Sequence, residues 1–410
     1  MRPSPDGQPE GGSWTRQARG LGVTWLVQSV TGLTMAMFGP LAPFLQDELN
    51  LSRAEVGLLA SALFFTSFVL LIPIGSTVDK IGERWGMIIG QSVIGLMMAL
   101  ASLAPSYAAL IGLVTLAGIG TNFTLPSTTR AIVIWFAART RATAMGIKQT
   151  GFNAGGLVAA IALPMVAIVG GFRPALLVVG GYALVMAIIS LLAYPTRQGQ
   201  PPATAGIPIR QTLAFLTSAD VLLAALVAAT FNLVQSSLIT YIVLYLNSVV
   251  LLPILLAGFY LALIQVSGAA GRIGWGLVSD RLLAGRRLEV LGFMAVGVIV
   301  LSAVIATLSP ETPPAILAAV MVLTGVVFLG WAGVYLTIAG EIGGLSLAAG
   351  STGVVATIAN VGILIGPPTF GFLVDLTDAY TVAWGFLAAS TAVGLAAVLI
   401  LRRRGHIDHA

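Results

Sequence analysis

Three basic side chains fall inside long apolar stretches of this sequence, and no acidic side chain does so. The three are Arg130, Lys148 and Arg272. A charge is costly to place in hydrocarbon, so ionisable residues in such stretches usually face a cavity or a partner rather than lipid. Because these stretches supply no carboxylate, we expect a negatively charged ligand to complete a site around Arg272 and Lys148.

Arg272 is the strongest candidate ligand-binding residue. As a helix, its segment places Arg272 eight residues before Asp280, or roughly 12 Å deeper in a membrane. Gln265, Gly268 and Gly276 share its helical face, a polar and small-residue strip that favours contact with protein or water. A guanidinium matches a carboxylate with planar donors and keeps its charge when desolvated. The alternative is a structural arginine that reaches lipid phosphates or helix-end carbonyls.

Lys148 lies seven residues beyond Arg141, or about 10 Å inside the next apolar stretch. Lys148 is a second candidate for a ligand-binding cavity, and the alternative for it is a side chain that extends to the membrane surface. Aromatic walls with a few donors suit an organic anion with an apolar body. Polar and aromatic residues that are candidates for this cavity, with ordinary helix packing as the alternative for each, are Gln28, Asn122, Gln149, Asn232, Gln235, Tyr241, Gln265, Trp331, Tyr335 and Asn360.

The composition excludes several classes of protein. The chain has 410 residues, of which 57% are hydrophobic and only 9% are charged, so it is a polytopic membrane protein rather than a soluble domain. It has no cysteine for a disulfide or a thiol nucleophile. Both histidines lie in the C-terminal tail, and the Gly-rich segments lack the phosphate-binding GK[ST], so we expect no enzyme, metal or cofactor.

Twelve apolar runs are long enough to cross the roughly 30 Å of hydrocarbon in a bilayer. Fifteen of the 20 Lys and Arg residues fall on one side if the N-terminus is internal, so both termini are predicted to be cytoplasmic. Since the basic residues cluster in these short loops, the net charge of +5 does not indicate nucleic-acid binding. The predicted spans are 20–44, 55–78, 85–104, 108–134, 143–168, 174–195, 219–247, 254–279, 289–308, 314–339, 350–374 and 380–401.

The chain divides into two related halves. Asp79 and Asp280 occupy matching positions in IGSTVDKIGERWG and WGLVSDRLLAGRR, and Asn153-Ala-Gly155 is echoed by Asn360-Val-Gly362. The predicted division is a cytoplasmic tail at 1–19, a six-helix bundle at 20–195, a cytoplasmic linker at 196–217, a second six-helix bundle at 218–401 and a cytoplasmic tail at 402–410.

These motifs resemble those of the major facilitator superfamily, and the resemblance covers nearly the whole chain. It rests on the loop motif from Gly75 to Arg84, its counterpart from Gly276 to Arg287, and the run WFAARTRATAMGIKQTGFNAGG at 135–156. The resemblance implies twelve transmembrane helices in two bundles around one central site, with spans 1, 4, 7 and 10 lining the cavity and spans 5 and 8 adjacent. Residues expected to act in gating are Gly75, Asp79, Lys80, Arg84, Gly276, Asp280 and Arg281. Arg130 is expected to be structural, with the loop-motif carboxylates as partners.

The segment RIGWGLVSDR is similar to that of organic-anion branches of the superfamily, including oxalate/formate antiporters and monocarboxylate carriers, where this arginine binds the carboxylate. The oxalate/formate pattern also has a lysine in span 11, and 350–374 has none, which disfavours dicarboxylate exchange. Nitrate carriers have a second arginine at the position of Leu71. We therefore predict a monomeric secondary transporter of a small monocarboxylate in the cell inner membrane, driven by proton symport or by exchange (antiport).

Two alternative functions belong to other classes of membrane protein. Exporters of drugs or hydrophobic compounds by proton antiport usually have an arginine at the position of Val114, before Gly118-Ile-Gly120, and a membrane carboxylate. This sequence has neither in its predicted spans. The other alternative is a sensor that binds a ligand on the same scaffold without transporting it.

Overall fold

The computed structural model describes residues 14–195, 218–283, 286–342 and 344–404. The predicted linker at 196–217 and most of both predicted tails lie outside these ranges. Every described element is a helix, as the long apolar runs predict. Eleven of these helices are long and apolar enough to cross a membrane.

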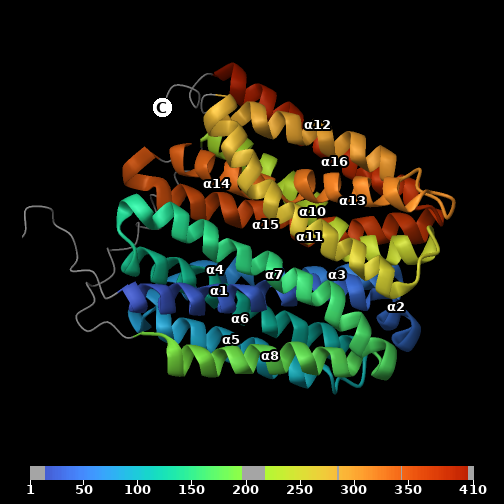
Figure 1. The fold of residues 1–410 in the computed structure, drawn as a ribbon, viewed down its shortest axis with the longest axis horizontal. Helices are drawn as coiled ribbons and strands as arrows, with labels where there is room; N and C mark the ends of the chain where they lie inside the picture. Colours follow the sequence, from blue (N-terminus) through green and yellow to red (C-terminus); the bar gives the residue numbers. More distant parts are fainter. Residues whose placement is uncertain (1–13, 196–217, 284–285, 343, 405–410) are drawn as a thin grey trace, which may run out of the picture.

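The helices of the first half lie together on one side of the molecule, in blue to green in Figure 1. They are α1 (Trp14–Ala36), α2 (Phe38–Leu49), α3 (Arg53–Phe65), α4 (Ser67–Ile81), α5 (Glu83–Ala101), α6 (Tyr107–Trp135), α7 (Ala138–Gly170) and α8 (Phe172–Ala193).

The helices of the second half lie on the other side, in yellow to red. They are α10 (Ala219–Ser248), α11 (Ile254–Leu277), the π-helical turn η2 (Val278–Leu282), α12 (Arg287–Ile305), α13 (Pro314–Phe328), α14 (Trp331–Ile342), α15 (Gly344–Thr377) and α16 (Tyr380–Arg404).

Three predicted spans are interrupted in the structure. The first begins at Trp14 rather than at residue 20, inside the predicted tail, and is divided at Met37. The second, predicted at 55–78, consists of the shorter helices α3 and α4, which meet at Thr66. The tenth is divided between α13 and α14. A break exposes backbone carbonyls that need partners, so these interruptions create polar positions inside the membrane region.

The sequence echo corresponds to the same helix contact in each half. A Cβ atom at Gly155 of α7 would collide with the carbonyl of Ser29 on α1, and one at Gly362 of α15 would collide with the carbonyl of Ala229 on α10. Glycine therefore allows the two backbones to touch, as small residues do between membrane helices. The repeat predicted from Asn153-Ala-Gly155 and Asn360-Val-Gly362 has this packing as its physical basis.

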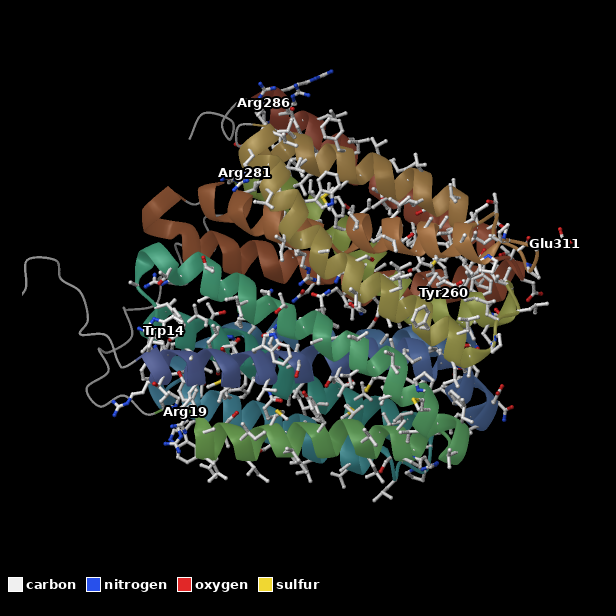
Figure 2. All side chains as sticks on the ribbon, in the orientation of Figure 1. Trp14, Arg19, Tyr260, Arg281, Arg286 and Glu311 are labelled. Atoms are coloured by element: carbon white, nitrogen blue, oxygen red, sulfur yellow. The ribbon has the colours of Figure 1, made fainter. Side chains whose placement is uncertain are left out.

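The two halves are joined at the end of the molecule that carries Arg53, here called the Arg53 end. The Asp375 carboxylate of α15 accepts the backbone N–H groups of Arg53 and Ala54, at 3.1 and 2.8 Å, in the first turn of α3. It also pairs with the Arg53 guanidinium at 3.4 Å. Figure 2 shows Glu311 at one end of the bundle and Trp14, with Arg281, towards the other. No described ion pair joins the halves at that other end.

Candidate functional site

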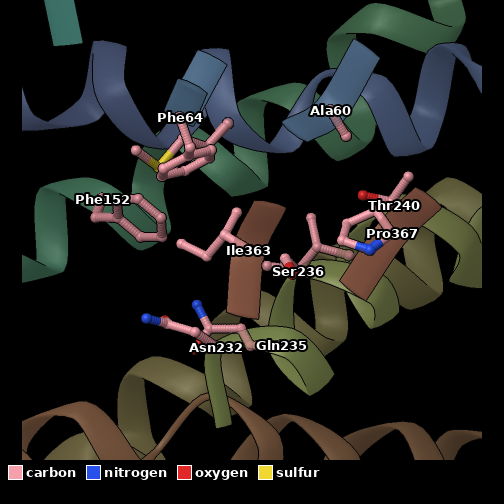
Figure 3. Close-up of a pocket in the computed structure, with 11 residues that line it drawn as sticks. Ala60, Phe64, Phe152, Asn232, Gln235, Ser236, Thr240, Ile363 and Pro367 are labelled. Atoms are coloured by element: carbon pink, nitrogen blue, oxygen red, sulfur yellow. The ribbon is translucent and has the colours of Figure 1, made fainter. Parts of the chain in front are cut away.

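A small, partly open pocket lies between the two halves. Figure 3 shows Phe64 and Phe152 of the first half on one side and Asn232 and Gln235 of the second on the other, with Ile363 between them. Its lining is mostly apolar with two amides and two hydroxyls, which is typical of sites for small organic molecules. The lining residues are Met35, Ala60, Phe64, Phe152, Asn232, Gln235, Ser236, Ile239, Thr240, Ile363 and Pro367.

The pocket is lined by α1, α3, α7, α10 and α15, which correspond to predicted spans 1, 2, 5, 7 and 11. Spans 1 and 7 were expected there. Spans 4 and 10 contribute no described residue to the lining of this pocket. The expected contact between spans 5 and 8 is present: the Asn153 amide of α7 donates to the Gln265 carbonyl of α11 at 3.1 Å.

Arg272 lies on α11 beside the pocket and is partly exposed. Its guanidinium carbon is 5.6 Å from the centre of the Phe152 ring. Its Nε donates to the Leu329 carbonyl at 3.1 Å, one of the carbonyls freed by the break between α13 and α14. No described carboxylate pairs with this guanidinium, and its terminal nitrogens have no partner among the described residues. Arg272 therefore has a structural contact and free donors at the same time.

Lys148 is enclosed in the first half instead of facing the pocket. Its side chain is 1% exposed. The ammonium donates to the hydroxyls of Thr128 and Thr129 of α6 at 3.3 and 3.4 Å, and Thr128 in turn donates to Gln28 of α1 at 3.5 Å. These acceptors are all neutral. The structure thus places Gln28 and Lys148 in one polar cluster, separate from Arg272.

The aromatic candidates of the second half lie against the pocket wall. Trp331 stacks between Phe231 and Tyr335, with ring centres 5.4 Å away in each case. Its indole N–H donates to Gln235 at 2.8 Å, which holds the Oε1 atom of that amide and leaves the NH₂ group for a ligand. Asn232 donates to the carbonyl of Ala359, the residue before Asn360, at 3.1 Å. The aromatic candidates Trp331 and Tyr335 therefore lie outside the pocket lining, and Trp331 contacts the pocket through Gln235.

Several buried polar atoms lack a partner near the contact of α7 and α11. They include both amide atoms of the fully buried Gln265, Oδ1 of Asn153 and Oε1 of Gln149. An unpaired buried polar atom costs about 1–3 kcal/mol. These unpaired atoms lie between the two halves, so a relative motion of the halves or a bound ligand would change their hydrogen-bond partners.

Asn122 and Tyr241 have structural partners and are not among the residues that line the pocket. Asn122 accepts from Ser67 at 2.6 Å and donates to Thr66 at 3.1 Å, so it holds the break between α3 and α4. Tyr241 donates to the carbonyls of Arg53 and Pro367 at the Arg53 end. Their residue types were suited to a cavity, but the sequence did not show these local partners.

The loop motif forms an ion cluster around Arg130. This guanidinium pairs with Asp79 at 3.0 Å and with the buried Glu83 at 3.4 Å. The structural role expected for Arg130 is thus confirmed. Arg84 donates to the Leu191 carbonyl at 2.6 Å, and Lys80 is exposed.

The remaining residues expected to act in gating have no described partner that links the halves. A Cβ atom at Gly75 or Gly276 would meet open space. Arg281 is exposed, and the Asp280 side chain lies outside the described part of the chain.

Phe152 was missed by sequence reasoning, although it contacts both the pocket and Arg272. A phenylalanine in an apolar helix gives no signal of its own. Its neighbours Gly151 and Asn153 could have indicated it, because a glycine and an amide on either side mark a segment that packs against other helices, here α1 and α11.

The comparison with protein families decides which family this chain represents. The sequence model of the Major Facilitator Superfamily matches residues 24–355. The chain belongs to this superfamily. Its members are membrane transporters and not enzymes, and the twelve-span fold predicted from sequence is that of the superfamily.

Relatives within the Major Facilitator Superfamily include carriers of organic anions. The chain is 27% identical over 399 residues to Monocarboxylate transporter 11 of Homo sapiens, covering 94% of this chain and 82% of that one. It is 27% identical over 164 residues to a probable sulfoacetate transporter of Cupriavidus necator, covering 40% of this chain and 38% of that one. A bacterial homologue of the lysosomal transporter Spinster has a similar fold, with a TM-score of 0.75 and 19% identity over 96% of this chain and 98% of that one.

Proposed function

We propose that this chain is a secondary transporter that moves a small organic anion, a monocarboxylate, by alternating access. The observation that carries the proposal is the guanidinium of Arg272, which lies beside the pocket and whose terminal nitrogens have neither a carboxylate nor another partner among the described residues. A bound carboxylate would accept two parallel hydrogen bonds from it and supply the missing negative charge. The names of relatives, a monocarboxylate transporter and a sulfoacetate transporter, support an anionic cargo.

Alternating access is supported by where the halves touch. The pocket lies between them, and the described polar contacts close it at the Arg53 end. We propose that the opposite end is cytoplasmic, as the distribution of Lys and Arg predicts, and that the protein functions as a monomer in the cell inner membrane. No described carboxylate contacts the pocket, so coupling to protons would use the proton of the anion itself or the Lys148 ammonium, and exchange of two anions needs neither.

Replacing Arg272 with glutamine tests the assignment in proteoliposomes. Glutamine keeps a donor for the Leu329 carbonyl but removes the charge. We expect uptake of labelled monocarboxylates to fall at least about 30-fold, because removing one member of a desolvated charge pair costs about 2–5 kcal/mol. Arg19→Gln, which changes an exposed arginine near the start of α1, is the matched control and should transport normally.

Two outcomes would contradict the proposal. One is equal carboxylate uptake by the wild type and Arg272→Gln. The other is a wild type that moves none of the carboxylates but transports tetraphenylphosphonium against a proton gradient, which would indicate the export of hydrophobic cations.

A further inference from the structure

The side chain of Phe152 borders the pocket and the guanidinium of Arg272 at once. Its ring lines the pocket, and the ring centre is 5.6 Å from the guanidinium carbon. We propose that Phe152 determines substrate specificity, favouring monocarboxylates whose carboxylate is attached to an aromatic or other bulky apolar body. This inference rests on the proposed function, because it takes Arg272 as the carboxylate-binding group.

The backbone of Phe152 is fixed by direct contact between α7 and α1. A Cβ atom at Gly32 of α1 would collide with the Phe152 carbonyl. Because of this contact, the helices cannot separate without losing packing. The ring of Phe152 can rotate about its side-chain bonds, but the fold sets the position of the backbone that carries it.

The rest of the lining indicates the kind of ligand that would extend from Arg272 into the pocket. Such a ligand must pass along the Phe152 ring, and it then meets Phe64, Met35 and Ile363. Transfer of an apolar group from water to such a wall is favourable, and offset or edge contacts between aromatic rings make binding more favourable still. Propionate would leave most of these contacts unused, so it should bind more weakly than an aryl-substituted acid.

The polar lining argues against a second carboxylate. The residues that line the pocket carry no charge, and their polar groups are neutral amides and hydroxyls. A dicarboxylate would therefore bury a second negative charge without a cation, which costs several kcal/mol. The free NH₂ group of Gln235 can donate to one neutral polar substituent of the ligand.

Calorimetric titration of the purified full-length protein with propionate, phenylacetate, phenylacetamide and phenylmalonate tests the inference. The wild type should bind phenylacetate about tenfold or more tightly than propionate. It should not bind the neutral amide, and it should bind the dicarboxylate poorly. In Phe152→Ala, phenylacetate affinity should fall about tenfold, whereas propionate affinity should change less than about threefold. Phe259→Ala removes an exposed ring from α11 and should leave both affinities unchanged.

The variants separate failure of this inference from failure of the proposed function. If Arg272→Gln abolishes binding of both acids while Phe152→Ala keeps the wild-type preference for phenylacetate, the role of Phe152 is wrong and that of Arg272 stands. If phenylacetate binds Arg272→Gln as tightly as the wild type, or no carboxylate binds the wild type, both fail. Phe152→Leu retains most of the side-chain volume and replaces the alanine variant if that one does not fold, with the same direction expected.

Discussion

Arg272 and Lys148 have different surroundings at the scale of single residues. Arg272 uses one nitrogen for the Leu329 carbonyl, and its terminal nitrogens have no partner among the described residues. Lys148 is enclosed, and its partners in the described part of the chain are two threonine hydroxyls. A planar guanidinium can serve a backbone carbonyl and a ligand together, whereas an ammonium group is a single point of charge. We therefore propose Arg272, and not Lys148, as the carboxylate-binding group in this conformation.

Replacing Lys148 with methionine tests whether its charge is stabilised by the protein. Methionine has a similar length, and replacing a buried ionic group with an apolar one is often neutral or stabilising. We expect the melting temperature of Lys148→Met to equal or exceed that of the wild type by a few degrees. Lys148→Glu should melt lower, because it buries a carboxylate without a cation. A clear loss of stability in Lys148→Met would show that the ammonium has a partner that stabilises it.

At the scale of elements, α15 of one half completes a helix end of the other. The first N–H groups of a helix have no partner inside the helix, and they attract negative charge. In α3, Ser52 and Glu55 form a capping box, and the Asp375 carboxylate accepts two further N–H groups. This contact, here called the Asp375 cap, exists only while the halves are together at the Arg53 end. It therefore stabilises the conformation that is closed there.

Asp375→Asn should shift the protein towards the conformation that is open at the Arg53 end. Losing a helix cap costs about 0.5–2 kcal/mol, so the open fraction should rise by roughly 2- to 30-fold. Because the chain has no native cysteine, a single Ala60→Cys in the pocket can be labelled from that end with an impermeant maleimide. The labelling rate should rise with Asp375→Asn and stay constant with Asp378→Asn, which changes an exposed carboxylate three residues further on. Equal rates would mean that the cap does not control closure.

At the scale of the whole molecule, the distribution of charge is the basis of the proposed membrane orientation. Arg19 and Arg281 lie towards the end that carries Trp14, whereas Glu311 lies at the other. We expect Glu311→Cys to react with an impermeant maleimide in intact cells, and Thr15→Cys to react only after the cells are permeabilised. The reverse pattern would place the Arg53 end in the cytoplasm and invert the direction of access described above.

The sequence by itself determined the fold class, the spans and the superfamily. Apolar runs of about 20 residues must cross the bilayer as helices, since hydrocarbon cannot pair an open backbone. The repeated Gly and Asn positions indicated two related halves. The charge count also selected Arg272, because an arginine in an apolar span without an acid is uncommon whatever the fold.

Only the tertiary structure decided which of the selected side chains meet. It placed Gln235 and Asn232 in the pocket and Arg272 beside the Phe152 ring that lines it, and it enclosed Lys148 in the first half. It also showed that Asn122 holds a helix break and that Tyr241 bonds to the closed end. The structure also showed the contacts of Phe152 and Asp375, two residues whose types gave no signal in the sequence. These assignments depend on which helix faces lie opposite each other across the two halves, and helical periodicity along one segment contains no information about the helix that packs against it.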